Sequence, residues 1–116
     1  DPSIRCYLVE PSGAAPVSGG EVTRAAHRIQ GGGYSMAELP LLARERIDGY
    51  LQVEDEEARL VARQLAAEAG LFAGYSSGAN VAAALQLLRG PCRGKTVVVL
   101  LGDTGMKYLS TDLWSD

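Results

Sequence analysis

The apolar residues of this chain follow two different periods. Residues 4–11 (IRCYLVEP) and 96–101 (TVVVLL) are nearly continuous apolar runs, as expected for strands buried on both faces, and residues 48–55 form a shorter run. In residues 55–69 and 76–89, apolar residues recur every three or four positions, which predicts two amphipathic helices. The β-branched run 96–101, which lies between glycines, is the clearest predicted strand.

Capping residues mark the ends of both predicted helices. Asp55 is the predicted cap of the first helix, with acidic residues in its first turn, and Gly70 is the predicted stop. Ser76 or Ser77 is expected to cap the second helix, and Gly90 is expected to end it.

The other segments predict loops and weaker helices. Residues 11–20 are rich in proline and glycine and predict a loop, whereas residues 21–29 carry a weak helical pattern. Residues 108–114 predict one or two helical turns at the end of the chain. Three consecutive glycines at 31–33 indicate a tight turn or a close approach of the backbone to another group.

Strands therefore alternate with helices, and the strands are apolar throughout. This order predicts an α/β fold with a mostly parallel, helix-flanked sheet. Ligands bind such sheets outside the carboxyl ends of the strands. We therefore expect the candidate site in the loops at 31–36, 75–78 and 102–106.

Composition limits the class of protein. The 116 residues allow one domain at most, and 47% apolar with 22% charged residues is an ordinary globular composition. A net charge of −3 and scattered arginines predict no nucleic-acid surface, and no run is long enough for a membrane span. With no signal peptide in the sequence, we expect a cytoplasmic protein. Cys6 and Cys92 are far apart, which argues against zinc, and Cys6 is expected to be a buried free thiol.

The stretch GYSSG at 74–78 fits the G-x-S-x-G pattern of a hydrolase nucleophile elbow. Ser76 would then need an acid and a histidine after it in the chain. Asp103 could be the acid, but the single histidine, His27, comes before the serine. Without a base the Ser76 hydroxyl stays protonated and is a poor nucleophile. We therefore interpret the stretch as a tightly packed start of a helix.

Three stretches together resemble one known family. They are EPSGAAPVSGG…HRIQGGGY (10–34), VEDEEARLVARQLAAEAGLFAGYSSGANVAAAL (53–85) and TVVVLLGDTGMKYLSTDLWSD (96–116). In order and spacing they look like the C-terminal part of the cysteine synthase and cystathionine β-synthase family, which are fold-type II enzymes that use pyridoxal 5'-phosphate (PLP). The resemblance covers residues 1–116, so we expect one partial domain, from the large domain of such an enzyme, with no internal boundary.

The resemblance implies a reaction at an amino-acid substrate. Family members convert serine or O-activated serine to an aminoacrylate, to which sulfide or another nucleophile adds at the β carbon. Their Schiff-base lysine and phosphate-binding loop lie in an upstream part that matches nothing here, since Lys95 and Lys107 stand at other positions. This chain is therefore expected to be inactive alone, to contain no catalytic residue and to need the remaining N-terminal part. The family also implies a homodimer.

The resemblance also implies site residues. Thr104 matches a family serine whose hydroxyl hydrogen-bonds the pyridine nitrogen of the cofactor; the alternative is a threonine that only satisfies its own turn. Gly31, Gly32, Gly33 and Tyr34 match the loop that closes over the cofactor and substrate. A tyrosine directly after the glycines is typical of the cystathionine β-synthase branch, and the alternative for Tyr34 is a buried tyrosine with a satisfied hydroxyl.

Several roles remain open. Asp103 is expected to cap the turn that follows it, His27 is expected to be structural or exposed, and no metal site is expected. The same cofactor could support β-elimination, as in serine or threonine dehydratases. A non-catalytic α/β module is the alternative from another class.

Overall fold

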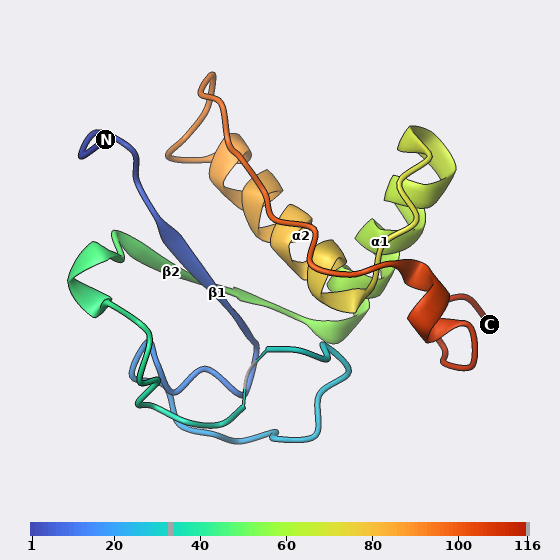
Figure 1. Cartoon of the computed structure of the whole chain (residues 1–116), viewed down its shortest axis with the longest axis horizontal. Coiled ribbons are helices and arrows are strands. Elements are labelled where there is room, and N and C mark those ends of the chain that lie inside the picture. Colours follow the sequence, from blue (N-terminus) through green and yellow to red (C-terminus); the bar gives the residue numbers. More distant parts are fainter. Residues whose placement is uncertain (33, 116) are drawn as a thin grey trace.

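Residues 1–32 and 34–115 are described by a computed structural model of the chain (Figure 1). In chain order, the elements of this part are the strand β1 (Tyr7–Pro11), the 3-10 helix η1 (Arg44–Arg46), the strand β2 (Gly49–Val53), the helices α1 (Asp55–Ala69) and α2 (Tyr75–Arg89), and the 3-10 helix η2 (Gly105–Tyr108). β1 and β2 pair in parallel, in register from Tyr7 opposite Gly49 to Pro11 opposite Val53. The expected α/β class with a parallel sheet is confirmed.

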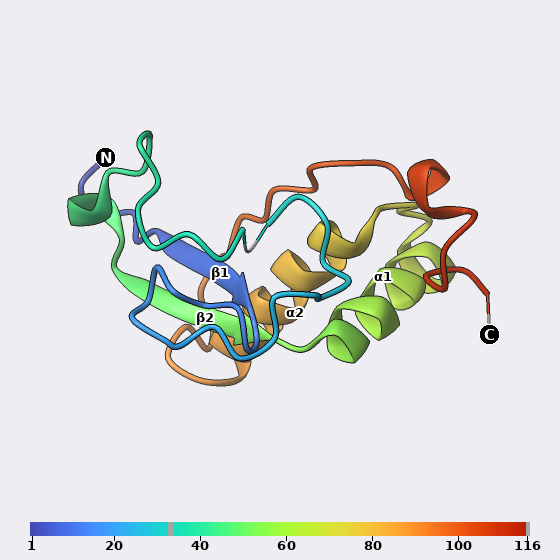
Figure 2. The same ribbon diagram turned by 90° about the horizontal axis from the view of Figure 1, so that it is seen from below.

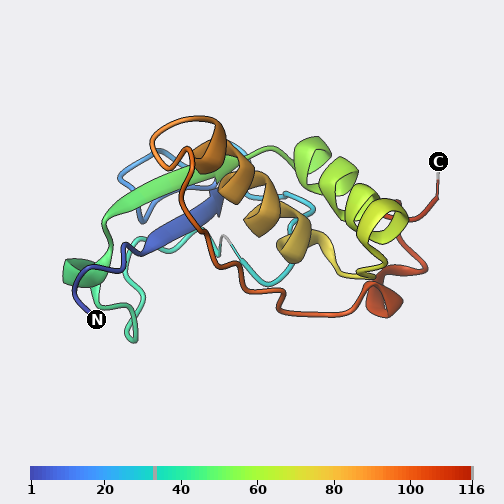
Figure 3. The same cartoon turned by 90° about the horizontal axis from the view of Figure 1, so that it is seen from above.

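α1 and α2 pack against each other through small residues (Figure 3). Ala58 and Ala62 of α1 are fully buried, and Ala82 of α2 is 1% exposed. Gly78 allows the two backbones to approach, because a Cβ built there would lie 2.1 Å from the carbonyl oxygen of Ala58. Gly70, with φ of 67°, ends α1 in the left-handed conformation, as the sequence predicts.

The predicted N-caps of both helices are wrong, whereas Gly90 ends α2 as predicted. The N-cap of α1 is Glu54, and Asp55 is already its first helical residue. The N-cap of α2 is Gly74, so that Ser76 and Ser77 lie inside the first turn and neither side chain caps the helix. Instead, the side chains of Asp103 and Tyr108 pack against Gly74 at the start of α2.

Residues 96–101 form no strand in the described part of the chain, so this prediction is also wrong. They run beside α2 without regular structure (Figure 2), and the side-chain amide of Asn80 donates a hydrogen bond to the carbonyl of Leu100 at 3.0 Å. Val98 is 92% exposed and Leu100 is 77% exposed. A strand needs a neighbour to satisfy its backbone groups. The residues that the structure describes supply none here.

Other local predictions also differ from the structure. Residues 21–29 form no helix, and the tail predicted at 108–114 is reduced to turns that follow η2. Cys6 is exposed rather than buried, because β1 begins only at Tyr7 and the residues before it lie outside the sheet. Within the described residues, no helix is long and apolar enough to cross a membrane.

Candidate functional site

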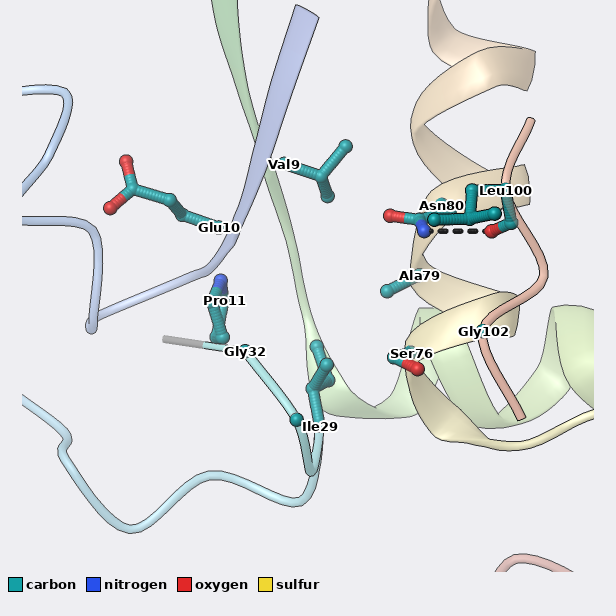
Figure 4. Close-up of a pocket in the computed structure, with 11 residues that line it drawn as sticks. Val9, Glu10, Pro11, Ile29, Gly32, Ser76, Ala79, Asn80, Leu100 and Gly102 are labelled. Carbon is teal, nitrogen blue, oxygen red and sulfur yellow. Dashed lines mark hydrogen bonds between the residues drawn. The ribbon is translucent and has the colours of Figure 1, made fainter. Parts of the chain in front are cut away.

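A pocket of about 230 Å³ lies between β1, the glycine loop and α2 (Figure 4). Its lining consists of Val9, Glu10, Pro11, Ile29, Gly31, Gly32, Ser76, Ala79, Asn80, Leu100 and Gly102. These residues come from all three loops that the sequence predicts at the site, together with β1 and the first turns of α2. The three loops named from the sequence therefore each contribute to one pocket.

The structure places the predicted site residues differently with respect to this pocket. Gly31 and Gly32 line it, whereas Gly33 lies outside the described residues. Tyr34 is 67% exposed, so it is not a buried tyrosine. Thr104 is exposed and lies two residues beyond Gly102, the last lining residue in the chain.

Two further polar residues of the pocket were missed by the sequence analysis. Glu10 is 4% exposed, and its carboxylate accepts hydrogen bonds from the backbone N–H groups of Val17 at 2.9 Å and Ser18 at 3.0 Å. It thereby fixes the loop that follows β1. Asn80 ties α2 to Leu100 across the pocket wall (Figure 4). Glu10 could have been found from the sequence, because it is a glutamate at the end of an otherwise apolar strand.

The turn that contains Thr104 is fastened to the segment before α2 on both sides. The N–H of Gly74 donates to the carbonyl of Asp103 at 3.3 Å, and the N–H of Gly105 donates to the carbonyl of Phe72 at 3.0 Å. Thr104 itself forms an isolated antiparallel bridge with Ala73. The backbone of this turn is therefore positioned by the entry into α2.

Side chains hold the same turn. The hydroxyl of Tyr108 donates to Oδ2 of Asp103. Burial, followed by this hydrogen bond, raises the pKa of Tyr108 to about 12, so its hydroxyl stays protonated at neutral pH. The prediction that Asp103 caps the turn after it is wrong. The N-cap of η2 is Thr104, whose Oγ1 accepts from the N–H of Met106 at 3.3 Å.

A second tyrosine–aspartate pair lies on the other side of the α2 start. The hydroxyl of Tyr75 donates to Oδ1 of Asp112 at 2.7 Å, and Arg28 forms an ion pair with the same carboxylate. Burial and then this hydrogen bond raise the pKa of Tyr75 to about 12, and the bond lowers the pKa of Asp112. The rings of Tyr75 and Tyr108 meet edge to face at 5.9 Å.

The glycine loop and the Thr104 hydroxyl bear on what this site could bind. Among the described residues, no heavy atom other than those of the chain neighbours lies within 4 Å of a Cβ built at Gly31 or Gly32, so these glycines leave open space beside the pocket. Because Oγ1 of Thr104 accepts from a backbone N–H, its own proton is left to be donated to another acceptor, such as a pyridine nitrogen. Among the described residues, no three His, Cys, Asp or Glu side chains gather where a metal ion could bind.

Comparison with known proteins identifies the family. Residues 1–103 match the sequence pattern described as "Pyridoxal-phosphate dependent enzyme". The chain belongs to this family. Over 114 residues it is 40% identical to a probable cysteine synthase of Bacillus subtilis, covering 98% of this chain and 36% of that protein. It is equally similar to the O-ureido-L-serine synthase of Streptomyces lavendulae, at 40% over 114 residues, with 97% and 34% covered.

Solved structures agree. The O-ureido-L-serine-bound K43A mutant of O-ureido-L-serine synthase matches with a TM-score of 0.87 and 40% identity, over 97% of this chain and 34% of that one. A cysteine synthase from Entamoeba histolytica matches with a TM-score of 0.87 and 31% identity, over 97% and 33%. The resemblance to fold-type II cysteine synthases is confirmed, and the family depends on pyridoxal phosphate. The chain spans about a third of the length of these relatives.

Proposed function

We propose that this chain is the C-terminal part of a PLP-dependent enzyme that exchanges the leaving group of an O-activated serine, or of serine, for sulfide or another nucleophile. The observation that supports this most is the meeting of the glycine loop, the start of α2 and Gly102 in one pocket of a chain 40% identical to a cysteine synthase. Cysteine and O-ureido-L-serine, the products in the names of its relatives, both carry their substituent on the β carbon.

Bound PLP withdraws electrons from the α carbon of an amino acid, which no protein side chain does. In this proposal the Thr104 hydroxyl would donate a hydrogen bond to the pyridine nitrogen and keep its proton, so that the nitrogen would stay neutral. A neutral nitrogen suits this reaction, because the leaving group on the β carbon takes away the developing charge. In this proposal Gly31 and Gly32 leave room for the ring and substrate, and Tyr34, from the same loop, would reach over the cleft.

The remainder of the enzyme is part of the proposal. Val98 and Leu100 present an apolar edge to solvent, and the pocket separates this edge from β1. Both features are explained if further strands, from the two thirds of the relatives that the chain does not match, complete the sheet. We therefore propose that residues 1–116 are one partial domain, inactive alone, and that the complete enzyme is a cytoplasmic homodimer.

Reconstitution tests the function. The chain is co-expressed with the segment that precedes it in its parent reading frame, and the visible absorbance of bound PLP is recorded. We expect bound cofactor only when both parts are present. If the complex is well folded and binds no PLP, the proposal is refuted and a non-catalytic α/β module is favoured.

Product analysis defines the reaction. With O-acetylserine and sulfide, we expect a β-substituted alanine by mass spectrometry; a 2-oxo acid and ammonia, formed equally without sulfide, would show elimination instead. The Thr104→Ser variant keeps a hydroxyl and is expected to bind PLP normally. The Thr104→Ala variant loses one hydrogen bond, which weakens cofactor binding roughly two- to tenfold.

A further inference from the structure

The side chain of Asp103 occupies an unusual position at the start of α2. A Cβ built on Gly74 would lie 2.4 Å from Oδ1 of Asp103 and 2.3 Å from a ring carbon of Tyr108. These two side chains therefore fill the space in which any other residue at position 74 would place its side chain. Since Gly74 is the N-cap of α2, the carboxylate lies against the positive end of that helix.

The carboxylate is only half satisfied. Oδ2 accepts from the hydroxyl of Tyr108, whereas Oδ1 is buried and has no hydrogen-bond partner within the described residues. A buried unpaired oxygen costs free energy, so that its presence calls for an explanation. The position of Asp103 is not explained by a cap hydrogen bond, because no side chain caps α2 and the side chain that caps η2 belongs to Thr104.

Hydrogen bonds of side chains hold η2 at both ends. At the start of η2, Oγ1 of Thr104 accepts from the N–H of Met106. At its end, the hydroxyl of Tyr108 donates to Asp103, the residue next to Thr104. The direction of the Thr104 hydroxyl depends on this turn, because the turn supplies the N–H to which Oγ1 is bound. If the turn opens, the backbone of Thr104 stays bridged to Ala73, but its hydroxyl is free to rotate.

We propose that Asp103 and Tyr108 are positioning residues, whose hydrogen bond clamps η2 and fixes the direction in which the Thr104 hydroxyl donates a hydrogen bond. This inference rests on the proposed function, in which that hydrogen bond is accepted by the pyridine nitrogen of PLP. Asp103 and Tyr108 touch neither cofactor nor substrate in this proposal. They act only through Thr104.

The test reads the pyridine nitrogen directly. The reconstituted holoenzyme is loaded with PLP isotopically labelled at that nitrogen, and its resonance is measured by NMR. Removal of a hydrogen bond from the nitrogen moves the resonance to lower field, so Thr104→Ala sets the full shift. Tyr108→Phe is expected to move it part of the way in the same direction and to add nothing in the Thr104→Ala background.

Tyr75→Phe is the matched control. It removes a similar buried tyrosine–aspartate hydrogen bond, to Asp112, and keeps the ring that contacts Tyr108. We expect it to lower stability without moving the nitrogen resonance. If Tyr108→Phe fails to fold, Asp103→Ala breaks the same bond from its other end, and Asp103→Asn, which keeps an acceptor oxygen, is expected to restore the wild-type resonance.

The outcomes separate the two proposals. If Thr104→Ala shifts the resonance and neither Tyr108→Phe nor Asp103→Ala does, the positioning role is overturned and the function stands. If Tyr75→Phe shifts the resonance as much as Tyr108→Phe, the effect is general loosening and the positioning role is again overturned. If Thr104→Ala itself leaves the resonance unchanged, the assigned role of Thr104 fails, and the inference fails with it.

Discussion

The close approach of α1 and α2 at Gly78 leads to a sharp prediction for Gly78→Ala. The added methyl group would lie 2.1 Å from the carbonyl oxygen of Ala58 and 3.0 Å from Cβ of Ala62. A carbon and a carbonyl oxygen rarely approach closer than about 3.3 Å, so the helices must separate by roughly an ångström. The clash is with backbone, which no rotation of a side chain relieves.

The magnitude follows from two opposing terms. Alanine gains about 1 kcal/mol over glycine in a helix interior. Overpacking of a close-packed interface costs about 1–3 kcal/mol and more where backbone must move, and separation also removes dispersion contacts among the buried alanines around it. We expect overpacking to dominate, with a net loss of about 2 kcal/mol in the free energy of unfolding.

Urea unfolding of the intact protein, followed by the helical circular dichroism signal, measures this loss. Gly32→Ala is the control, because within the described residues no heavy atom outside the chain neighbours lies within 4 Å of its added methyl group, and we expect a change of no more than about 1 kcal/mol. Ala62→Gly in the Gly78→Ala background should not restore stability, since the closer contact is with the oxygen of Ala58. A Gly78→Ala protein as stable as wild type would refute the close approach of the helices.

Three further predictions concern other contacts. Gly70→Ala forces a side chain into the left-handed conformation that ends α1, and we expect a loss of about 1 kcal/mol in urea unfolding. Arg63 donates from Nε to the carbonyl of Leu113 at 2.7 Å, and Arg63→Lys, which lacks the planar fork, should speed amide hydrogen exchange in the C-terminal tail while leaving α2 unchanged. Because the pKa of Tyr75 is raised to about 12, its contribution to stability is present below pH 10 and is lost as the pH rises toward 12. The pKa of Asp112 is lowered, so its contribution to stability is lost in acid. The urea midpoint of Tyr75→Phe should therefore change less with pH than that of the wild type in both ranges.

Local signals made much of the fold predictable. The parallel strands and both long helices appear within a few residues of where apolar periodicity predicts them. Gly70 ends α1 because its left-handed φ is a property of that residue and its immediate neighbours. The three loops named from the sequence each contribute to one pocket, although none of them directly follows a strand of the described residues.

The start of α2 could not be predicted in the same way. Sequence offers two serines as caps, yet both lie inside the helix, and Ser77 is fully buried. What holds this end is a pair of residues about thirty positions later, Asp103 and Tyr108, packed on Gly74. Sequence patterns report on residues that are close together in the chain. The only local sign of the contact with Asp103 and Tyr108 is therefore the glycine at position 74.

Residues 96–101 were also mispredicted because their structure depends on residues far away in the sequence. Its β-branched residues carry the strongest strand signal in the sequence, but β-propensity measures how well a side chain fits a sheet that is already there. Among the described residues, the backbone of Leu100 bonds only the side chain of Asn80 on α2, and Val98 lies almost fully exposed. The solved relatives, about three times longer, supply the residues that could form the adjoining strands. The strand signal and the lack of a strand here are therefore consistent with the proposal that these residues are one part of a larger sheet.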